Sequence, residues 1–561
     1  MELLNQSIEK WDDVASVFEE LVQRAIHSPD QLRQWLLDRS ELEALLQEDL
    51  GWRYIKHTCD TANEAKHESL NRFIQDIEPH LAEYNDVLNK KLLACGHLDS
   101  LHTAGYAVYL RTVRKEVEMF RESNIPLLTE IQQLSNEYGQ ISGAMTVEVN
   151  GKTSTMQQAA VELKSTDREH RKAVYLLMNA RRLEAVPQLN ALFDKLFTLR
   201  NQVAQNAGYA NFRDYMFDSL GRFDYTPQHC FDFHASIAKH IVPLINRFDA
   251  KRKETLGYET LKPWDMDVDP EQLLPLKPYA DASELIAKTK ELFASIRPAF
   301  GQVIETMEKR GHFDLDSRIG KAPGGYNYPL YKSSLPFIFM NSAGTLRDMV
   351  TMMHEGGHAI HSWLSKDLEI TPFKSTPSEI AEVASMAMEL ISMEHWERFF
   401  ENEKDLVRAK KYQLEKILSI LPWIAIVDAF QHWIYVNPTH TSEERSAKWK
   451  ALLHEFGSAV VDKSDYPEFD HHSWHKQLHI FEVPFYYIEY GIAQLASIAI
   501  WKRYKENPQG TINAYCRALE AGYTLTLPQL YEIAGIRFDF SDSYVRDIAE
   551  FVQAEYARLD D

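Results

Sequence analysis

The sequence predicts a mainly α-helical protein with small β elements. Amphipathic, charged runs with helical spacing dominate from residue 1 to about 250. The run 111–137, for example, contains no Gly and only one Pro, Pro126, so little in it would interrupt a helix. Stretches with strand-like alternation are few and short, and no repeat of fixed period is present. Most of the hydrophobic core must therefore lie between helices.

Three features interrupt this helical pattern. Residues 147–152 read Val-Glu-Val-Asn-Gly-Lys, which predicts a hairpin with Asn-Gly in its turn. Residues 257–280 are rich in Pro and mark a connection into the second half of the chain. Residues 337–340 predict a short strand, and we expect an edge strand that could pair with an extended peptide.

The most informative motif lies in the helix that follows this strand. Its apolar stripe recurs at helical spacing: Leu346, Met349, Val350, Met353, Ile360 and Leu364. His354 and His358 lie one turn apart beside the stripe, so both imidazoles can reach one Zn²⁺. Glu355 completes the H-E-x-x-H pattern and can take a proton from an attacking water. The alternative is two histidines that are hydrogen-bonded at a helix–helix seam.

Two glycines inside the motif favour the metal site. Gly356 and Gly357 each cost about 1 kcal/mol of helix propensity relative to Ala, so a purely structural helix would avoid them. Small residues here would let another backbone or a substrate approach closely.

A catalytic zinc usually takes three protein ligands, and the next helix offers the third. His361 is closer in sequence, but it points toward the apolar stripe and is not the preferred ligand. The longer metzincin pattern is excluded, because Leu364 stands where a metzincin carries its third His. Residues 376–379 read Thr-Pro-Ser-Glu, which predicts a capping box that would occupy Glu379. Glu382 is then the preferred metal carboxylate, and Glu389 could orient a ligating histidine. The alternative for both is a solvated acidic face.

These residues resemble those of oligoendopeptidase F, in the thimet oligopeptidase and neurolysin family of zinc metallopeptidases. The resemblance rests on Pro-Phe-Ile-Phe-Met-Asn at 336–341, His-Glu-Gly-Gly-His-Ala-Ile-His at 354–361 and Ala-Glu-Val-Ala-Ser at 381–385. It is strong over 321–390, where Gly-Gly-Tyr-Asn-Tyr at 324–328 matches a mobile loop of the family. It is weaker from 261 to the C-terminus, and little more than helical character before 145. The family pattern makes Glu382 the third zinc ligand.

The resemblance also gives roles to an aromatic segment near the C-terminus. In the family, a His and several tyrosines here bind the substrate backbone and stabilise the tetrahedral intermediate. The matching residues are His479, Tyr486 and Tyr490, and the two tyrosines share a helical face. The thimet branch carries a further tyrosine where this chain has Ala493, which leaves open how far the match extends. The alternative is an aromatic helix packed in the core.

The resemblance implies a two-lobed helical fold with a small β element beside the zinc helix and a deep active-site channel. We expect an N-terminal helical region at 1–185 and a catalytic zinc metallopeptidase region at 186–561, with segments shared between the lobes. The implied function is an oligoendopeptidase with one Zn²⁺ per chain that hydrolyses short unstructured peptides, with Glu355 as general base. Two alternatives stay open: a zinc carboxypeptidase of related helical fold, and a non-catalytic peptide-binding protein, which would not need Glu355.

Composition and charge limit the partners and the compartment. The 561 residues are 45% hydrophobic with a net charge of −21, which disfavours nucleic acids and anionic membranes. Residues 1–6 do not resemble a signal peptide, and the apolar run 417–430 is too short to span a bilayer. The four scattered cysteines predict reduced thiols in a cytoplasmic protein, neither disulfides nor a metal knuckle: Cys59, Cys95, Cys230 and Cys516. The histidines at 470–475 predict a polar loop, with a second metal site as the alternative.

Overall fold

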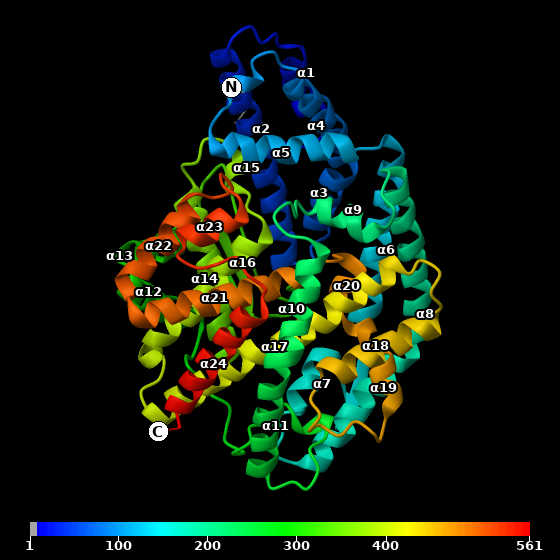
Figure 1. The fold of residues 1–561 in the computed structure, drawn as a ribbon, viewed down its shortest axis with the longest axis vertical. Coiled ribbons are helices and arrows are strands. Elements are labelled where there is room, and N and C mark those ends of the chain that lie inside the picture. The colour runs from blue at the N-terminus through cyan, green and yellow to red at the C-terminus, as the bar shows by residue number, and fades with distance from the viewer. Residues whose placement is uncertain (1–7, 561) are drawn as a thin grey trace. The chain divides into compact units, whose positions relative to one another are not determined.

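A computed structural model of the protein describes residues 8–560 and is 71% helical (Figure 1). The chain forms two compact units, each assembled from three segments. Unit 1 comprises Met1–Phe120, Leu276–Ala409 and Ala493–Phe538; unit 2 comprises Arg121–Pro275, Lys410–Ile492 and Asp539–Asp561. The mainly α prediction is confirmed. The expected functional division between 1–185 and 186–561 stays a prediction; α8 runs through that position.

Unit 1 contains a three-stranded sheet and helices from three parts of the chain. Its elements are α1 (Asp12–Gln23), α2 (Pro29–Cys59), α3 (Glu64–Asp76), α4 (Glu78–Leu93), η2 (Leu98–Ser100), α5 (Ala104–Met119), α12 (Ala282–Ile296), α13 (Pro298–Lys309), β3 (Phe313–Asp316), β4 (Tyr326–Tyr328), β5 (Phe337–Ser342), α14 (Leu346–Ser365), α15 (Thr371–Lys374), α16 (Ser378–Ser392), η5 (Met393–Arg398), α22 (Pro508–Glu520) and α23 (Leu527–Ile533).

Unit 2 is helical apart from one hairpin. Its elements are η3 (Glu122–Asn124), α6 (Ile125–Gly143), β1 (Thr146–Val149), β2 (Lys152–Thr155), α7 (Met156–Glu162), α8 (Arg168–Asn206), α9 (Phe212–Ser219), α10 (Pro227–His240), α11 (Val242–Leu256), η4 (Pro263–Asp265), α18 (Ser442–Phe456), α19 (Pro467–His471), η6 (Ser473–Lys476), α20 (Leu478–Glu482) and α24 (Asp542–Arg558). Two long helices contribute residues to both units, α17 (Glu403–Val436) and α21 (Tyr487–Glu506).

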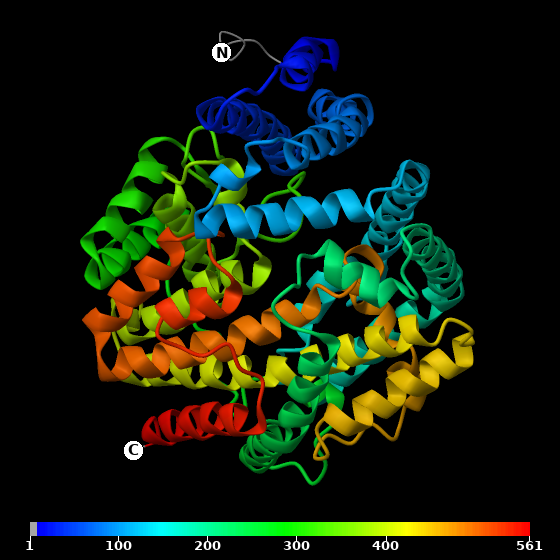
Figure 2. The same cartoon turned by 45° about the horizontal axis from the view of Figure 1, so that its top comes forward.

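The first five helices of unit 1 share an apolar core. Their buried faces meet around Trp35, whose indole N–H donates to the carbonyl oxygen of Leu21 at 2.9 Å. Figures 1 and 2 both show α5 lying across this group of helices. Burial of these apolar faces stabilises the group, since each fully buried Leu or Phe contributes about 1.5–3 kcal/mol relative to an exposed one.

The sheet of unit 1 has the order β3-β5-β4, with β5 parallel to β3 and antiparallel to β4. The expectation of an edge strand at 337–340 is therefore wrong: β5 is the central strand, and β4 is an edge. Phe337 to Met340 are all buried. That continuous apolar run, without polar alternation, is typical of a strand covered on both faces, which explains the error.

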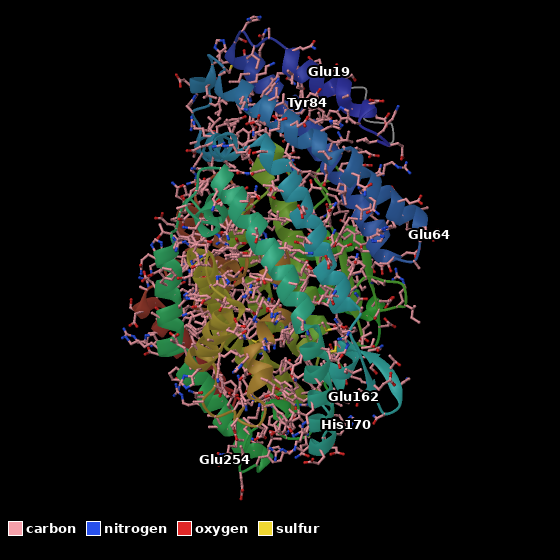
Figure 3. The ribbon with its side chains drawn as sticks, turned by 90° about the vertical axis from the view of Figure 1, so that its right-hand side faces the viewer. Glu19, Glu64, Tyr84, Glu162, His170 and Glu254 are labelled. Atoms are coloured by element: carbon pink, nitrogen blue, oxygen red, sulfur yellow. The ribbon has the colours of Figure 1, made fainter. Side chains whose placement is uncertain are left out.

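Unit 2 contains the predicted hairpin. β1 and β2 pair antiparallel, and Asn150 and Gly151 take φ of 54° and 73° in the turn, as a tight two-residue hairpin requires. The hairpin leads into α7, and the start of α8 returns to the end of α7, where His170 Nε2 lies 2.8 Å from a carboxylate oxygen of Glu162 (Figure 3). The Pro-rich connection is held by fully buried Asp265, which pairs with an arginine of α8, Arg171, at 2.8 Å.

One helix among the described residues, α17, is long and apolar enough to cross a membrane by length and composition. However, 72% of its apolar window is buried inside the protein, as in many core helices. Two expectations concern residues outside the described part of the chain. One is that residues 1–6 do not resemble a signal peptide, and the other is the helical signal over residues 1–7.

Candidate active site

The sequence of α14 places its two motif histidines on one side of the helix. Thr345 begins the helix with a capping box, in which its hydroxyl accepts from the Asp348 N–H and the Asp348 carboxylate accepts from the Thr345 N–H. His354 and His358 follow one turn apart, with ring centroids separated by 5.0 Å. Both side chains are about one-fifth exposed, at 23% and 20%, so the rings are not fully buried.

The two glycines of the motif let α14 approach its neighbours. A Cβ on Gly357 would lie 2.6 Å from both the carbonyl oxygen of Ala384 and the Cα of Ser385, which belong to α16. A Cβ on Gly356 would lie 2.6 Å from the ring of Phe293. Another backbone therefore occupies the space above Gly357, as the sequence suggested, and this approach brings the carboxylates of α16 to the histidines.

The start of α16 differs from the prediction. The helix begins at Ser378, its N-cap is Pro377, and no side chain caps it, so the predicted capping box of Thr376 and Glu379 is wrong. Pro377 has an extended ψ of 149°, and a proline also disfavours helical geometry in the residue before it. Pro377 itself is therefore outside the helix, which begins at the next residue. Glu379 is buried beside Tyr531, whose hydroxyl donates to the Glu379 carbonyl oxygen at 3.2 Å.

Three side chains from the two helices converge on one point. Oε2 of Glu382 lies 3.3 Å from Nε2 of His354 and 3.7 Å from Nε2 of His358. The three potential ligand atoms all lie within 4.8 Å of one another. Tetrahedral ligands held about 2.0–2.1 Å from a zinc ion are about 3.3 Å apart, so these separations fit a single Zn²⁺ with little rearrangement.

Two further side chains fix the orientation of these groups. Nδ1 of His354 lies 2.7 Å from a carboxylate oxygen of Glu389, two turns along α16 from Glu382, which leaves Nε2 to face the cluster. The hydroxyl of Ser385 donates to Oε2 of Glu382 at 3.0 Å and also to its carbonyl oxygen. Carboxylates and hydroxyls placed behind metal ligands in this way hold ligand orientation. The sequence suggested the contact of Glu389, but not that of Ser385.

The acidic cluster perturbs the titration of its members. Burial raises the pKa of Glu355 to about 7. Burial lowers the pKa of His354, but hydrogen bonds to Glu382 and Glu389 outweigh it and hold the pKa well above its ordinary value. Burial lowers the pKa of His358 to about 4. For Glu382, burial is opposed by its hydrogen bond with His354 and the charge of His358, and the pKa falls to about 2.

Two other residues near the motif, His361 and Asn327, contact the core and the motif backbone. His361 is buried against the core, and burial lowers its pKa to about 3, so it is a packed neutral histidine as expected. Asn327, in the edge strand β4, donates to the carbonyl oxygen of Glu355 at 3.2 Å. This bond joins β4 to the motif helix; residues 326–328, expected in a mobile loop, are a strand paired with β5.

The aromatic segment of unit 2 forms a cluster of its own. The rings of Tyr486 and Tyr490 are 5.3 Å apart, and the ring of His479 lies 6.3 Å and 6.0 Å from them. Tyr487 joins the cluster, with its ring 4.7 Å from that of His479. The structure thus brings together the three residues selected from this segment.

A hydrogen-bonded chain fixes the tautomer of His479. The indole N–H of Trp423, which can only donate, lies 3.0 Å from Oε1 of Gln477. The amide nitrogen of Gln477 therefore faces Nδ1 of His479, at 2.7 Å, and donates to it. The remaining proton of the neutral ring is then on Nε2. Burial lowers the pKa of His479 to about 4, so the ring is neutral near pH 7 and Nε2–H is a donor.

The start of α21 is held rigidly by buried polar contacts. Phe485 adopts a left-handed φ of 68°, and its N–H donates to Oε1 of Gln431 at 2.8 Å. Arg222 donates to the Phe485 carbonyl oxygen and pairs with Glu489 at 2.7 Å. Sequence reasoning missed this framework, because its members are far apart in the chain.

The histidines at 470–475 do not form a metal site. Among residues 8–560, the side chains that could hold a metal ion gather in two places, and neither includes this segment. His475 is buried, with Nδ1 near the His472 carbonyl oxygen at 2.8 Å and Nε2 near Asn190 at 2.9 Å. The predicted loop is therefore wrong: the segment lies in α19 and the 3-10 helix η6, and His475 packs inward.

A helical fold that presents H-E-x-x-H on one helix and a carboxylate on the adjoining helix defines a class, the helical metallopeptidases. Comparison with known proteins gives the family. The model of peptidase family M3 matches residues 161–550, and the model of the peptidase M3 N-terminal domain matches residues 5–120. The chain belongs to peptidase family M3.

Individual relatives agree with this membership. The oligoendopeptidase F homolog of Borreliella burgdorferi is 28% identical over 290 residues, which are 50% of this chain and 48% of that protein. The oligopeptidase PepF of Bacillus subtilis is 24% identical over 203 residues, 36% of this chain and 30% of that one. These matches span about half the length of the curated relatives, or less. A structure of PZ peptidase A with an inhibitor superposes with a TM-score of 0.90 at 26% identity, over 98% of this chain and 97% of that one.

Proposed function

We propose that the protein is a zinc-dependent oligoendopeptidase that hydrolyses internal bonds of short, unstructured peptides. The observation that carries the proposal is the convergence of His354, His358 and Glu382, with ligand atoms within 4.8 Å of one another beside Glu355. Membership of peptidase family M3 and the names of its relatives support the same chemistry.

His354, His358 and Glu382 are the proposed ligands of one Zn²⁺. When bound, the metal lowers the pKa of water and polarises a carbonyl group. Two histidines and one carboxylate leave an open coordination position, which is the arrangement of catalytic rather than structural zinc. Glu389 fixes the tautomer of His354, and Ser385 fixes the rotamer of Glu382. Two of the three proposed ligands are therefore held in place.

Glu355 is the proposed general base. It follows His354 directly, so its carboxylate projects from the same helix turn, and it is buried to 6% exposure. It takes a proton from the attacking water and delivers it to the leaving amine nitrogen. The backbone of this turn is held by the amide of Asn327 from β4. Because β4 is an edge strand, it is also the proposed strand for pairing with an extended peptide.

His479, Tyr486 and Tyr490 are proposed to donate hydrogen bonds to the substrate, including its developing oxyanion. The proposal rests on the family resemblance, on the clustering of the three rings and on the fixed Nε2–H of His479. The orientation of such a neutral donor is set before the substrate binds. Little reorganisation energy is therefore spent when the oxyanion forms.

Location and domain roles follow from the same proposal. The metal and aromatic clusters both fall within residues 186–561, which supports assigning catalysis to that region and a helical, non-catalytic role to 1–185. None of the four cysteines, all among the described residues, is in a disulfide. That pattern supports a reducing, cytoplasmic location.

Peptides blocked at both ends test the proposal. Purified protein loaded with Zn²⁺ should cleave an N-acetylated, C-amidated peptide of about ten residues at internal bonds, as seen by mass spectrometry of the fragments. A carboxypeptidase needs the free carboxylate and would act only on unblocked peptides. Binding without cleavage of either form would instead establish the non-catalytic alternative.

A further inference from the structure

A second group of metal-ligating side chains lies in unit 2, outside the site described above. Cys230 and His234 stand four residues apart on α10, and Asp428 and His432 stand four residues apart on α17. Residues with this spacing share one helix face, so each helix presents a pair. Figures 1 and 2 both show α10 crossing α17.

The atoms of this group lie as close together as those of the active site. Potential ligand atoms of Cys230, Asp428 and His432 are all within 4.8 Å of one another. Nε2 of His432 is 3.3 Å from Oδ2 of Asp428, the same separation as between His354 and Glu382. His234 approaches from the other side, with Nε2 at 2.8 Å from Oδ2 of Asp428.

Two members of the group, Asp428 and His432, have polar atoms without a hydrogen-bond partner among the described residues. Oδ1 of Asp428 and both ring nitrogens of His432 are buried without a hydrogen-bond partner. Nε2 of His432 is near Oδ2 of Asp428, but without hydrogen-bond geometry. Asp428 is 0% exposed and His432 is 3% exposed, so solvent does not compensate. Buried polar atoms in native proteins nearly always have partners, and here three unpartnered atoms belong to a group of potential metal ligands within 4.8 Å of one another, which suits a bound metal ion.

The surroundings favour a metal ion over a reactive thiol. Cys230 is 1% exposed, so the group is closed to a substrate. The ring of His432 is enclosed by aromatic neighbours, with Phe231 at 4.9 Å and Phe485 at 5.4 Å. A thiolate and a carboxylate together neutralise a divalent cation, so the filled site would bury no net charge. The combination of sulfur, imidazole and carboxylate ligands is typical of zinc.

We propose that Cys230, Asp428 and His432 bind a second, enclosed Zn²⁺ that joins α10 to α17. His234 is a positioning residue: its Nε2–H donates to Oδ2 of Asp428 and so holds the carboxylate in place. The site does not depend on the proposed function, since none of its residues belongs to the active site. The protein then carries two zinc ions per chain, one exposed to substrate and one enclosed.

Cobalt substitution tests the proposal, because only the second site contains sulfur. The protein is produced in medium with Co²⁺ in place of Zn²⁺, so that the metal enters as the chain folds. We expect an intense near-ultraviolet band from thiolate-to-cobalt charge transfer and two metal ions per chain by mass spectrometry. The double variant His354→Ala, His358→Ala should keep the band and one ion, because it lacks only the catalytic ligands.

Matched cysteine variants assign the band. Cys230→Ser should abolish it, whereas Cys516→Ser, at another buried cysteine outside both groups, should leave it unchanged. Asp428→Asn should reduce the metal content to one ion per chain. Wild-type protein without the band and with a single ion would overturn the proposal, and this result does not depend on any variant folding. A band that survives in folded Cys230→Ser would overturn it equally.

Discussion

The two candidate metal-binding clusters have similar local geometry and differ in their surroundings. In the first, two histidines four residues apart on one helix meet a carboxylate from another helix. In the second, two residues four apart on one helix meet a second such pair from another helix. His354 and His358 remain about one-fifth exposed, whereas Cys230, Asp428 and His432 are 0–3% exposed. The exposed cluster has no sulfur and carries a buried acid, Glu355, in its motif; the enclosed cluster has a thiol. The comparison teaches that two clusters with similar ligand spacing can differ in access, and a catalytic zinc requires a position open to water and substrate.

The clusters also differ in how their orientation is fixed. At the active site, Glu389 and Ser385 each hold one ligand from behind, and Gly357 lets the two helices meet closely. In the enclosed cluster a single residue, His234, holds Asp428. A catalytic site needs its ligands fixed on one side while the other stays open, so it requires more supporting contacts.

Removing the third ligand should have the largest effect. Glu382→Ala should lose the catalytic zinc and with it all measurable peptidase activity, because two histidines alone hold zinc weakly. The metal content should fall by one ion per chain, as measured after dialysis, while the enclosed ion stays. Glu379→Gln, one turn away on the same helix and outside the ligand group, is the matched control and should keep its metal. The opposite pattern would move the ligand role to Glu379.

Chelation should separate the two clusters in the unaltered protein. Dialysis against EDTA at neutral pH should remove one zinc ion and all activity, and added Zn²⁺ should restore both. The second ion should leave only after denaturation, since its ligands are enclosed. Parallel loss of both ions would show that the clusters do not differ in access.

The tyrosine of the aromatic cluster should affect the rate more than binding. Tyr490→Phe deletes one hydroxyl and keeps the ring, so we expect kcat to fall about 10²-fold with KM little changed, as for loss of one oxyanion donor. Steady-state kinetics and a thermal melt measure both effects. Tyr215→Phe, in the same unit but outside the cluster, should be neutral. An unchanged kcat in Tyr490→Phe would assign this tyrosine to core packing.

The supporting carboxylate should give the smallest effect. Glu389→Gln keeps the shape but weakens the bond that sets the tautomer of His354, so zinc affinity should fall about 10- to 100-fold. Competition with a fluorescent zinc chelator measures this. Glu394→Gln, on the 3-10 helix that follows α16, is a suitable control. Equal affinities in wild type and Glu389→Gln would remove Glu389 from the metal site.

The sequence was informative where the site is local and uninformative where it is assembled from distant segments. The spacing of His354 and His358 predicts their geometry because a helix fixes it, and Glu382 was within reach on the next helix. The capping box at 376–379 is wrong because the helix begins one residue later, with Pro377 as N-cap. The edge strand at 337–340 is wrong because pairing partners are not visible in a strand's own residues. The enclosed cluster was missed altogether, since its two pairs are almost two hundred residues apart and each looks like an ordinary buried pair.

Aromatic positioning was predicted only in part. His479, Tyr486 and Tyr490 cluster as expected, but the amide that fixes the tautomer of His479 comes from Gln477, and its own orientation depends on Trp423. Nothing in the sequence pattern links these two residues, because Trp423 lies in a helix far earlier in the chain. Second-layer contacts of this kind require the structure.

Glu355→Gln tests the central claim most directly. The amide matches the shape of the carboxylate but cannot accept the proton, so cleavage of a doubly blocked peptide should fall at least about 10²-fold. The catalytic zinc should be retained, because the three ligands are untouched. Rate and metal content measured on the same sample separate chemistry from metal loss. The account predicts an inactive variant with wild-type metal content; a variant that cleaves the peptide at the wild-type rate would contradict it.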